Sequence, residues 1–592
     1  MSEKFVQKTW DLGELFHSME GDEVNQAIEE LQANFEKFEQ IRHLLNDELD
    51  AQKLLEIINQ YEQGIRLLSK LVGYAQLLFS EDTQDQVAQA FLGKVQQLSA
   101  ELENKTLFFN LWWKGLEDEV AGPLLKSAGD YAYWLKQMRL FKPHTLSEAE
   151  EKVINLKDVN GVQAIVTLYS SITNRYTFKL MEDGEEKQLT RGELSVYYRH
   201  HDAELREASY KELYRLYGED APILGQMYQY RARDWRSEQM DLRGHSSPMG
   251  ARNLGNDIPD DVVDSLLEAC QANSSIFHRF FRLKARWIGM DKLRRYDIYA
   301  PVAKGDKTYT FNEAIEMTLD SFRQFDPRFA DLAQSILDED HLDSEVRKGK
   351  RAGAFCATLT PDLTPWVLAS YQGRPDDVAT LAHELGHAVH SLLSNHHTAL
   401  TQGASLPLAE TASTFGEILL IDHLRALDTS PAVRQDLLFR QMDDAYATIM
   451  RQAYFSIFEK DAHDRILQGA AVDDISELYL ENLKNQFGDS LDLSADFRYE
   501  WLAIPHFYHT PFYVYAYAFG QLLVFSLYKQ YRQDEGEFKP RFIELLASGG
   551  SDSPVNILER AHLDVRSPEF WQGGFDVIDG ILKELESLEV PA

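Results

Sequence analysis

The amino-acid sequence predicts a mainly α fold with a few short β segments. Apolar residues recur at spacings of three and four over most of the 592 positions, which is typical of amphipathic helices. Only three short segments, at 176–194, 296–302 and 350–373, have the composition expected of strands. With 44% apolar and 26% charged residues, the chain has the composition of a folded globular protein.

The N-terminal part of the chain is predicted to be helical. Three long helices are expected over 22–46, 51–79 and 85–116. A turn pair, Asp183 and Gly184, separates TFKL from EEKQL and predicts a β-hairpin. The hairpin is the candidate domain boundary, so that residues 1–195 form a helical N-terminal region ending in the hairpin and residues 196–592 form a second domain.

The second domain is predicted to be mostly helical as well. Helical spacing returns over 195–241 and 259–288, and YDIYAPV at 296–302 has the character of a strand. Short alternating runs in 350–373 are interrupted by prolines and a glycine, which indicates a small β-sheet.

Charge and cysteine content limit the classes of function. The 60 basic and 95 acidic residues give a formal charge of −35, which argues against binding nucleic acid or an anionic membrane. Cys270 and Cys356 are too few for a disulfide framework or a cysteine-based zinc site. No uncharged apolar run reaches about 18 residues, and the N-terminus lacks the pattern of a signal peptide. We expect a cytoplasmic protein whose oligomeric state is open, with a monomer favoured.

A metal-binding pattern follows the predicted sheet. A helix is expected to begin near residues 374–377 with an aspartate as its N-cap, and it contains the sequence HExxH. His383 and His387, four residues apart, project from one face and can bind one ion, while Glu384 beside them can take a proton from a metal-activated water. The alternative is a surface helix with solvated side chains. The apolar surroundings argue against it, because uncompensated burial of these groups costs several kcal/mol.

A catalytic metal of this type needs a third protein ligand. The segment LAETASTFGEILLIDHL is predicted to be a buried helix that carries Glu410 and Glu417, two turns apart and on the same face. We expect Glu410 to be the third ligand and Glu417 to orient a ligand histidine, with an ordinary surface carboxylate as the alternative for Glu417. His390 is one turn too far along its helix to be a fourth ligand.

An aromatic segment at 504–525 supplies candidate hydrogen-bond donors. If Pro511 occupies the first turn of a helix, Tyr513 and Tyr517 share a face and Tyr515 points elsewhere. Phenols, or His506, could stabilise the oxyanion that develops during peptide hydrolysis. The alternative is an aromatic core helix.

Taken together, these segments resemble the thimet oligopeptidase and oligoendopeptidase F family of zinc metallopeptidases, most closely its oligoendopeptidase F branch. The resemblance rests on the blocks GKRAGAFC, DDVATLAHELGHAVHSL, ETASTFGE, IPHFYHTPFYVYAYAFG and LASGGSDSP, which lie between residue 349 and residue 554.

The resemblance implies the roles of individual residues. One Zn²⁺ per chain would be bound by His383, His387 and Glu410, with Glu384 as the general base. His506, Tyr513 and Tyr517 would contact the substrate and the oxyanion, with His509 and Tyr515 as the alternatives in a shifted register.

The resemblance also implies the architecture and the activity. Two helical halves would flank a deep substrate channel, with a small β-sheet beside the HExxH helix, and residues 196–592 would be the zinc peptidase catalytic domain. The GAFC stretch would offer a strand edge to an extended peptide. The expected activity is endopeptidase cleavage of oligopeptides. The alternatives are a zinc carboxypeptidase or dipeptidyl carboxypeptidase, and a non-catalytic peptide-binding protein with a retained zinc site.

Overall fold

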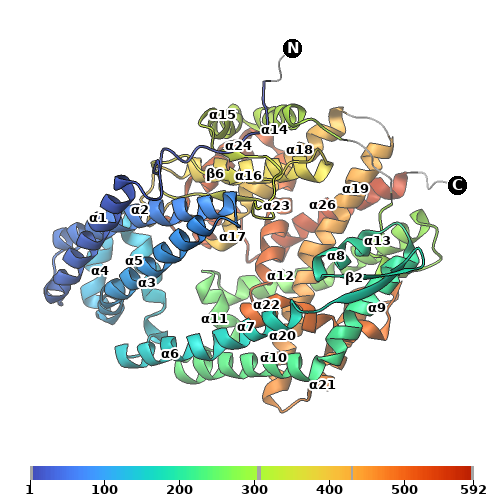
Figure 1. Cartoon of the computed structure of the whole chain (residues 1–592), viewed down its shortest axis with the longest axis horizontal. Coiled ribbons are helices and arrows are strands. Elements are labelled where there is room, and N and C mark those ends of the chain that lie inside the picture. The colour runs from blue at the N-terminus through green and yellow to red at the C-terminus, as the bar shows by residue number, and fades with distance from the viewer. Residues whose placement is uncertain (1–3, 303–307, 428–430, 589–592) are drawn as a thin grey trace. The chain divides into compact units, whose positions relative to one another are not determined.

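The computed structural model describes residues 4–302, 308–427 and 431–588, most of which are helical (Figure 1). This confirms the predicted mainly α fold. The chain packs into two compact units, each assembled from three stretches. The first unit consists of Met1–Lys142, Asp306–Asp428 and Gln530–Leu563, and the second of Pro143–Gly305, Thr429–Lys529 and Asp564–Ala592. The predicted domain boundary at residue 195 is drawn along the sequence, and these two units do not test it. It stays a prediction.

The helices of the first unit include the three predicted near the N-terminus. Two of these begin at aspartate N-caps, where Asp50 accepts the Lys53 N–H at 2.8 Å and Asp85 accepts the Val87 N–H at 2.8 Å. The helices of this unit are α1 (Asp22–Gln40), α2 (Ala51–Glu81), α3 (Gln86–Gly115), α4 (Asp118–Lys126), α5 (Ala132–Leu140), α14 (Phe311–Phe325), α15 (Pro327–Asp338), α16 (Pro375–Leu393), α17 (Leu406–Ala409), α18 (Thr411–Leu427), α24 (Glu535–Ala547) and α25 (Pro554–Arg560).

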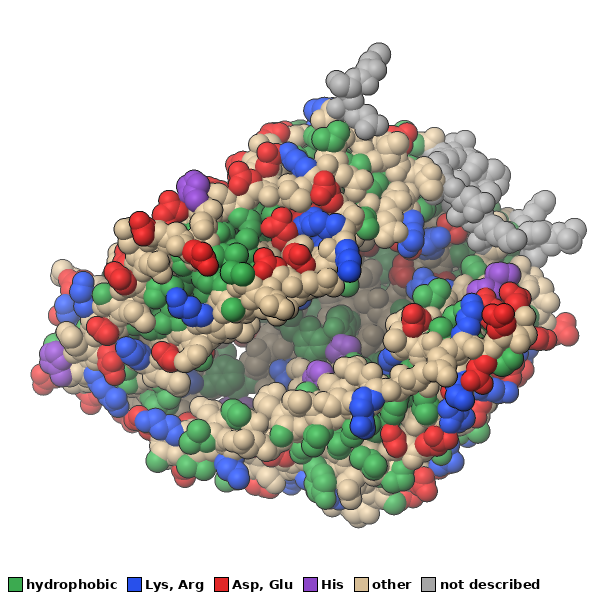
Figure 2. Space-filling view, viewed as in Figure 1, with side chains coloured by type: hydrophobic (Ala, Val, Ile, Leu, Met, Phe, Trp, Pro, Cys, Tyr) green, Lys and Arg blue, Asp and Glu red, His purple; other side chains and the backbone are tan. Residues whose placement is uncertain are grey.

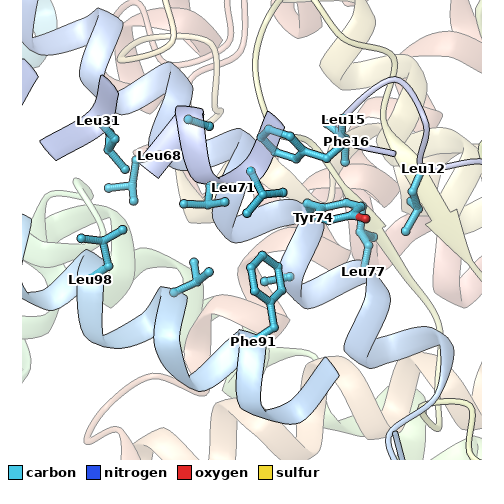
Figure 3. Packing of buried hydrophobic residues seen from close by; sticks show 14 of the residues in the cluster. Leu12, Leu15, Phe16, Leu31, Leu68, Leu71, Tyr74, Leu77, Phe91 and Leu98 are labelled. Atoms are coloured by element: carbon cyan, nitrogen blue, oxygen red, sulfur yellow. The ribbon is translucent and has the colours of Figure 1, made fainter. Parts of the chain in front are cut away.

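A small sheet and an apolar core support these helices. The sheet has the order β4 (Leu342–Asp343), β6 (Trp366–Leu368), β5 (Phe355–Ala357), so the predicted β region at 350–373 is confirmed and gains one strand from upstream. Trp366 and Leu368 of β6 join the core formed by the apolar stripes of α1, α2 and α3. Figure 3 shows part of this core, with Tyr74 among the leucines of the helices. Burial of these apolar side chains stabilises the packing of the N-terminal helices against the sheet.

The second unit is also mainly helical. Its helices are α6 (Glu148–Asn160), α7 (Val162–Thr173), α8 (Arg191–Val196), α9 (Ala203–Glu219), α10 (Ala221–Arg236), α11 (Pro248–Gly255), α12 (Asp260–Ala272), α13 (Ser274–Trp287), α19 (Pro431–Ala445), α20 (Arg451–Leu467), α21 (Val472–Phe487), α22 (Pro505–His509), most of α23 (Tyr515–Gln533) and α26 (Pro568–Ser587). The predicted hairpin is confirmed as β1 (Phe178–Glu182) and β2 (Glu185–Leu189), which pair antiparallel with Phe178 opposite Leu189. A two-residue parallel pair joins β3 (Leu293–Arg294) to β7 (Leu491–Asp492).

The strand predicted at 296–302 is wrong. The chain forms β3 just upstream and then a tight helical turn over Arg295–Asp297. The aromatic side chain that suggested a strand instead packs in the interior, where the Tyr296 ring lies 5.2 Å from that of Phe497. Arg295 in the same turn is 1% exposed and donates to Glu500 at 2.9 Å. Packing of side chains against distant elements therefore overrides the local strand preference.

The surface reflects the acidic composition. On the face in Figure 2, acidic and basic side chains are interspersed over the described residues, without a broad basic area. None of the helices in the described part of the chain is both long and apolar enough to cross a membrane.

Candidate metal centre

The HExxH motif lies on α16, as predicted, but the start of this helix differs from the prediction. Arg374, not an aspartate, is the N-cap residue. Asp377, three residues into the helix, accepts the N–H groups of Gln372 and Arg374, both at 2.9 Å. The negative charge of Asp377 in the first turn still interacts favourably with the helix dipole and stabilises the helix.

Two glycines allow α16 and α18 to pack closely along one another (Figure 1). A Cβ atom on Gly386 of α16 would lie 2.6 Å from the Ser413 Cα, and one on Gly416 of α18 would lie 3.1 Å from the Ala382 carbonyl oxygen. These contacts are with backbone, which cannot move aside easily. Gly386, within the HELGH sequence, is therefore needed for the approach of α18 to the two histidines.

Three side chains converge at this crossing. His383 Nε2 and His387 Nε2 lie 3.1 Å apart, and each lies 3.3 Å from Glu410 Oε2. Among the described residues, these three form a group able to hold a metal ion, and His390 is not part of it. Glu410 differs from expectation in one respect, because it lies at the junction between α17 and α18 rather than inside a continuous helix.

Two further residues hold this group in place. Glu417 Oε1 lies 2.5 Å from His383 Nδ1, the ring nitrogen that faces away from Glu410. Such a contact fixes the orientation of a ligand histidine and raises its basicity. The Ser413 hydroxyl donates to Glu410 Oε2 at 3.0 Å. The sequence interpretation missed Ser413, although its position three residues after Glu410 at a helix start is a recognisable signal.

Mutual contacts control the protonation of the group. Burial by itself would lower the pKa of His383, but hydrogen bonds with Glu410 and Glu417 outweigh it and raise the pKa to about 10. Burial would raise the pKa of Glu410, yet its hydrogen bonds with both histidines hold that pKa well below its ordinary value. The cluster therefore attracts a positive charge, which either a proton or a metal cation supplies.

Glu384 differs from Glu410 in its surroundings. Its side chain is buried, with 6% of the residue exposed, and burial raises its pKa above the usual value for a glutamate. It belongs with His383, His387 and Glu410 to the wall of a cavity of about 420 Å³. A carboxylate with a raised pKa beside a cation site is suited to exchange protons with a bound water.

A strand edge lines the same cavity. Phe355 and Cys356 of β5 belong to its wall. Within the three-stranded sheet, β5 pairs only with β6 and so is an edge strand. Strand β5 is also in contact with α16, the helix that carries the HExxH motif.

The predicted aromatic residues form a cluster in the second unit. The Tyr517 hydroxyl lies 3.3 Å from His506 Nε2. The Tyr513 and Tyr517 rings are 5.3 Å apart, and each lies within 6.3 Å of the His506 ring. The structure thus brings these three side chains together.

The alternative residues of this segment lie elsewhere. Tyr515 is 0% exposed, and its hydroxyl accepts a hydrogen bond from Asn256 at 2.9 Å, as expected of a core residue. The His509 ring packs 6.3 Å from Tyr169 instead of joining the cluster. The expected place of Pro511 in the first turn of a helix is wrong: it lies between α22 and α23, and Pro505 begins α22 instead.

Comparison with known proteins gives a consistent result over nearly the whole chain. Residues 196–577 match the model of peptidase family M3, and residues 113–178 match the model described as oligopeptidase F. Oligopeptidase PepF of Bacillus subtilis (strain 168) is 26% identical, with 99% of this chain and 88% of the relative covered. Group B oligopeptidase PepB of Streptococcus agalactiae is 27% identical, with 98% and 96% covered.

Solved structures share the fold. A crystal structure from Chlamydophila abortus has a TM-score of 0.87 at 25% identity and covers 98% of both chains. Oligoendopeptidase-F from Enterococcus faecium has a TM-score of 0.72 at 23% identity, with 95% of this chain and 98% of that chain covered. The family model spans more than half of the sequence and includes the HExxH helix. The chain is a metallopeptidase and belongs to peptidase family M3.

Proposed function

We propose that the protein is a zinc-dependent endopeptidase that hydrolyses internal peptide bonds of short, unstructured oligopeptides. The observation that carries the proposal is the convergence of His383, His387 and Glu410 on one point in the wall of a cavity, with Glu384 beside them. The names of the curated relatives, among them oligoendopeptidase F of Lactococcus lactis, support an endopeptidase.

The three ligand candidates fit zinc. Neighbouring ligands of a tetrahedral zinc ion, at bond lengths of about 2.0–2.1 Å, lie about 3.3 Å apart. The three separations between the ligand atoms are 3.1, 3.3 and 3.3 Å. Two imidazoles and one carboxylate leave a fourth position for water, which is typical of catalytic rather than structural zinc.

The residues around the site have defined roles in the proposed reaction. Zinc bound there would lower the pKa of a water molecule and polarise the scissile carbonyl group. Glu384 accepts the proton of the attacking water and returns it to the nitrogen of the leaving amine. Its buried position, which raises its pKa, makes it a stronger base for the first transfer than an ordinary glutamate would be. Glu417 holds the His383 ring in the orientation that directs Nε2 toward Glu410.

The aromatic cluster is proposed to stabilise the oxyanion. His506, Tyr513 and Tyr517 present N–H and O–H groups within a small volume of the second unit. Donors directed at the developing negative charge can lower the barrier by several kcal/mol.

We propose that the substrate backbone binds along the unpaired edge of β5. An extended peptide can pair with a free strand edge through main-chain hydrogen bonds, which accept almost any sequence. Most backbone groups of a folded protein are already paired internally, which fits a preference for unstructured peptides. The cytoplasmic location and the deep substrate channel stay predictions. Cys270 and Cys356 are both free thiols.

Product mapping tests this proposal. The purified protein is incubated with unstructured peptides of about 5–20 residues and one folded protein, with and without a chelator, and the products are identified by mass. We expect internal cuts in the peptides only, which chelation abolishes and zinc restores.

Other outcomes would contradict the proposal. Stepwise removal of residues from the C-terminus would show the carboxypeptidase or dipeptidyl carboxypeptidase alternative. Cleavage that persists in the metal-free protein would exclude a metal-dependent reaction, and zinc binding without cleavage would show the peptide-binding alternative.

A further inference from the structure

A second cavity of about 420 Å³ lies in the second unit and has a wall rich in arginine and tyrosine. The arginines come from two distant parts of the sequence: Arg191 and Arg199 precede α9, whereas Arg451 begins α20. Tyr198 and Tyr299 lie between them in the wall, and Glu500 supplies its one carboxylate. The cavity shares no residue with the wall of the metal site.

The positive charges of this wall exceed the negative ones. Glu500 Oε1 accepts hydrogen bonds from Arg451 and from the buried Arg295 behind it, both at 2.9 Å. One carboxylate thus serves two guanidinium groups. This local excess of positive charge contrasts with the formal charge of −35 of the whole chain.

The two arginines at the rim have uncharged partners. Arg191 donates to the Tyr217 hydroxyl and to the Ala503 carbonyl oxygen, the latter at 2.9 Å. The Arg199 guanidinium lies 5.7 Å from the centre of the Tyr299 ring. Neither forms an ion pair with a carboxylate of the described residues. The nearby Asp443 is already paired with Lys284 at 2.7 Å.

Several buried donors of the same cluster have no partner in the described part of the chain. Those that line the cavity are the Nε atom of Arg451 and the hydroxyl groups of Tyr198 and Tyr299. Leaving a buried donor without a partner destabilises the folded state, and it does so more strongly when the group is charged. An accumulation of such donors indicates a site that a ligand with several acceptor atoms completes.

The chemistry of the wall selects the ligand. Guanidinium groups bind planar carboxylates through paired hydrogen bonds, and phenols add further donors. The cavity is far larger than a single inorganic ion, and Leu213, Tyr210 and Tyr214 give it an apolar side that suits a carbon skeleton. A carboxylate attached to an organic body therefore fits better than a free halide.

The position of the cavity relates it to the proposed reaction. Ala503 and Ile504 in its wall directly precede α22, the helix that carries His506. A ligand held there lies beside a segment proposed to contact the substrate.

We propose that this arginine–tyrosine pocket binds a carboxylate of the peptide substrate, from either the free C-terminus or an acidic side chain. The proposal rests on the proposed peptidase function for the identity of the ligand. It makes Arg191, Arg199, Tyr198 and Tyr299 determinants of substrate preference that do not take part in bond cleavage.

Direct binding tests the pocket separately from catalysis. Glu384→Gln protein is titrated into fluorescent peptides of about ten residues that share one neutral sequence, and binding is followed by fluorescence anisotropy. One peptide has a free C-terminus, the second is amidated, and the third is amidated with one Gln replaced by Glu. We expect at least one carboxylate peptide to bind about tenfold or more tightly than the neutral amide. Which of them does so identifies the source of the carboxylate.

Pocket variants in the same background complete the test. Arg199→Met and Arg191→Met should bring the preference for the carboxylate close to one, and Tyr299→Phe, which keeps the ring, should reduce it several-fold. The matched control is Arg282→Met, because Arg282 is a surface residue of the same unit that pairs with Asp489 at 2.5 Å. That variant should keep the full preference.

The outcomes separate this proposal from the peptidase proposal. Equal affinity for all three peptides, or a preference that survives in Arg199→Met, Arg191→Met and Tyr299→Phe alike, would overturn the pocket even if the unaltered protein cleaves peptides. A preference that depends on the pocket would support it even if no cleavage is observed.

Discussion

The metal-site region of the first unit and the aromatic segment of the second carry functional side chains in different ways. On α16, His383 and His387 are one helical turn apart, and helix geometry alone places them on the same face. In the aromatic segment, His506 lies on α22 and Tyr517 on α23, with an irregular turn between them. Regular structure determines the first arrangement, whereas the second depends on how a turn packs against its surroundings.

Within the aromatic segment, we expect the three Tyr→Phe substitutions to differ most strongly in their effect on kcat. Tyr513→Phe and Tyr517→Phe each remove a hydroxyl from the His506 cluster, and loss of one oxyanion donor costs about 10²–10³-fold in kcat. Tyr515→Phe removes a hydroxyl that is bonded to Asn256 in the core, so it should cost about 1 kcal/mol in stability and leave kcat nearly unchanged. Steady-state kinetics and thermal unfolding of the three variants measure both effects. A loss of kcat in Tyr515→Phe alone would show that the register is shifted.

The turn between α22 and α23 packs against buried ionisable groups of α20. The Phe512 ring lies 4.6 Å from that of His463, and Glu459, one helical turn before His463, is 0% exposed. Burial raises the pKa of Glu459 to about 8, well above the ordinary glutamate value of 4.5. Between these two pH values the folded state holds a proton that the unfolded state releases, so the free energy of unfolding falls as the pH rises.

This pH dependence should be measurable in the whole protein. The contribution of Glu459 is on the order of 3 kcal/mol between pH 5 and pH 8, and Glu459→Gln should remove it. Denaturant unfolding at several pH values, monitored by fluorescence, measures the change. If the pH profile of the variant matches that of the unaltered protein, Glu459 is ionised in the folded state.

In the metal-site region, contacts around the ligands should affect affinity for the ion. Glu417→Ala removes the group that lies 2.5 Å from His383 Nδ1, and loss of such a contact typically lowers metal affinity about 10–100-fold. Titration of the metal-free protein with zinc against a competing chelator measures this. An unchanged affinity would mean that packing alone orients His383.

The smallest of these effects is expected at the helix crossing. Gly386→Ala places a Cβ atom 2.6 Å from the Ser413 backbone, and overpacking of this kind costs about 2 kcal/mol. Gly93→Ala in α3 is the control, since its Cβ would meet nothing within 4 Å and alanine favours the helix. We expect a lower Tm in the first variant and an equal or higher Tm in the second. Equal stability of the two variants would show that α18 can move away from α16 without cost.

The same contrast explains how far the sequence interpretation could go. The long N-terminal helices and the HExxH helix follow from local periodicity, and the structure agrees closely. The strand expected at 296–302 failed because Tyr296 and Arg295 are buried by partners about 200 residues away. The prediction that Pro511 lies in the first turn of a helix was wrong, because only tertiary packing decides which proline begins the short helix.

Other features have no local signal at all. The arginine–tyrosine pocket combines residues near 191–214, 299, 451 and 500, whose proximity depends on the folded chain. Likewise, Glu410 could be predicted as a ligand, but its place at a helix junction could not, because α17 is only four residues long.

We propose that Glu384 acts as the base beside a metal held by His383, His387 and Glu410. Metal content and turnover of Glu384→Gln and Glu410→Ala, measured together on a peptide substrate, test it most directly. We expect Glu384→Gln to retain one zinc per chain while kcat falls by about 10²–10⁴-fold, and Glu410→Ala to lose most of its zinc. Normal turnover in Glu384→Gln, or full zinc occupancy in Glu410→Ala, would contradict the account.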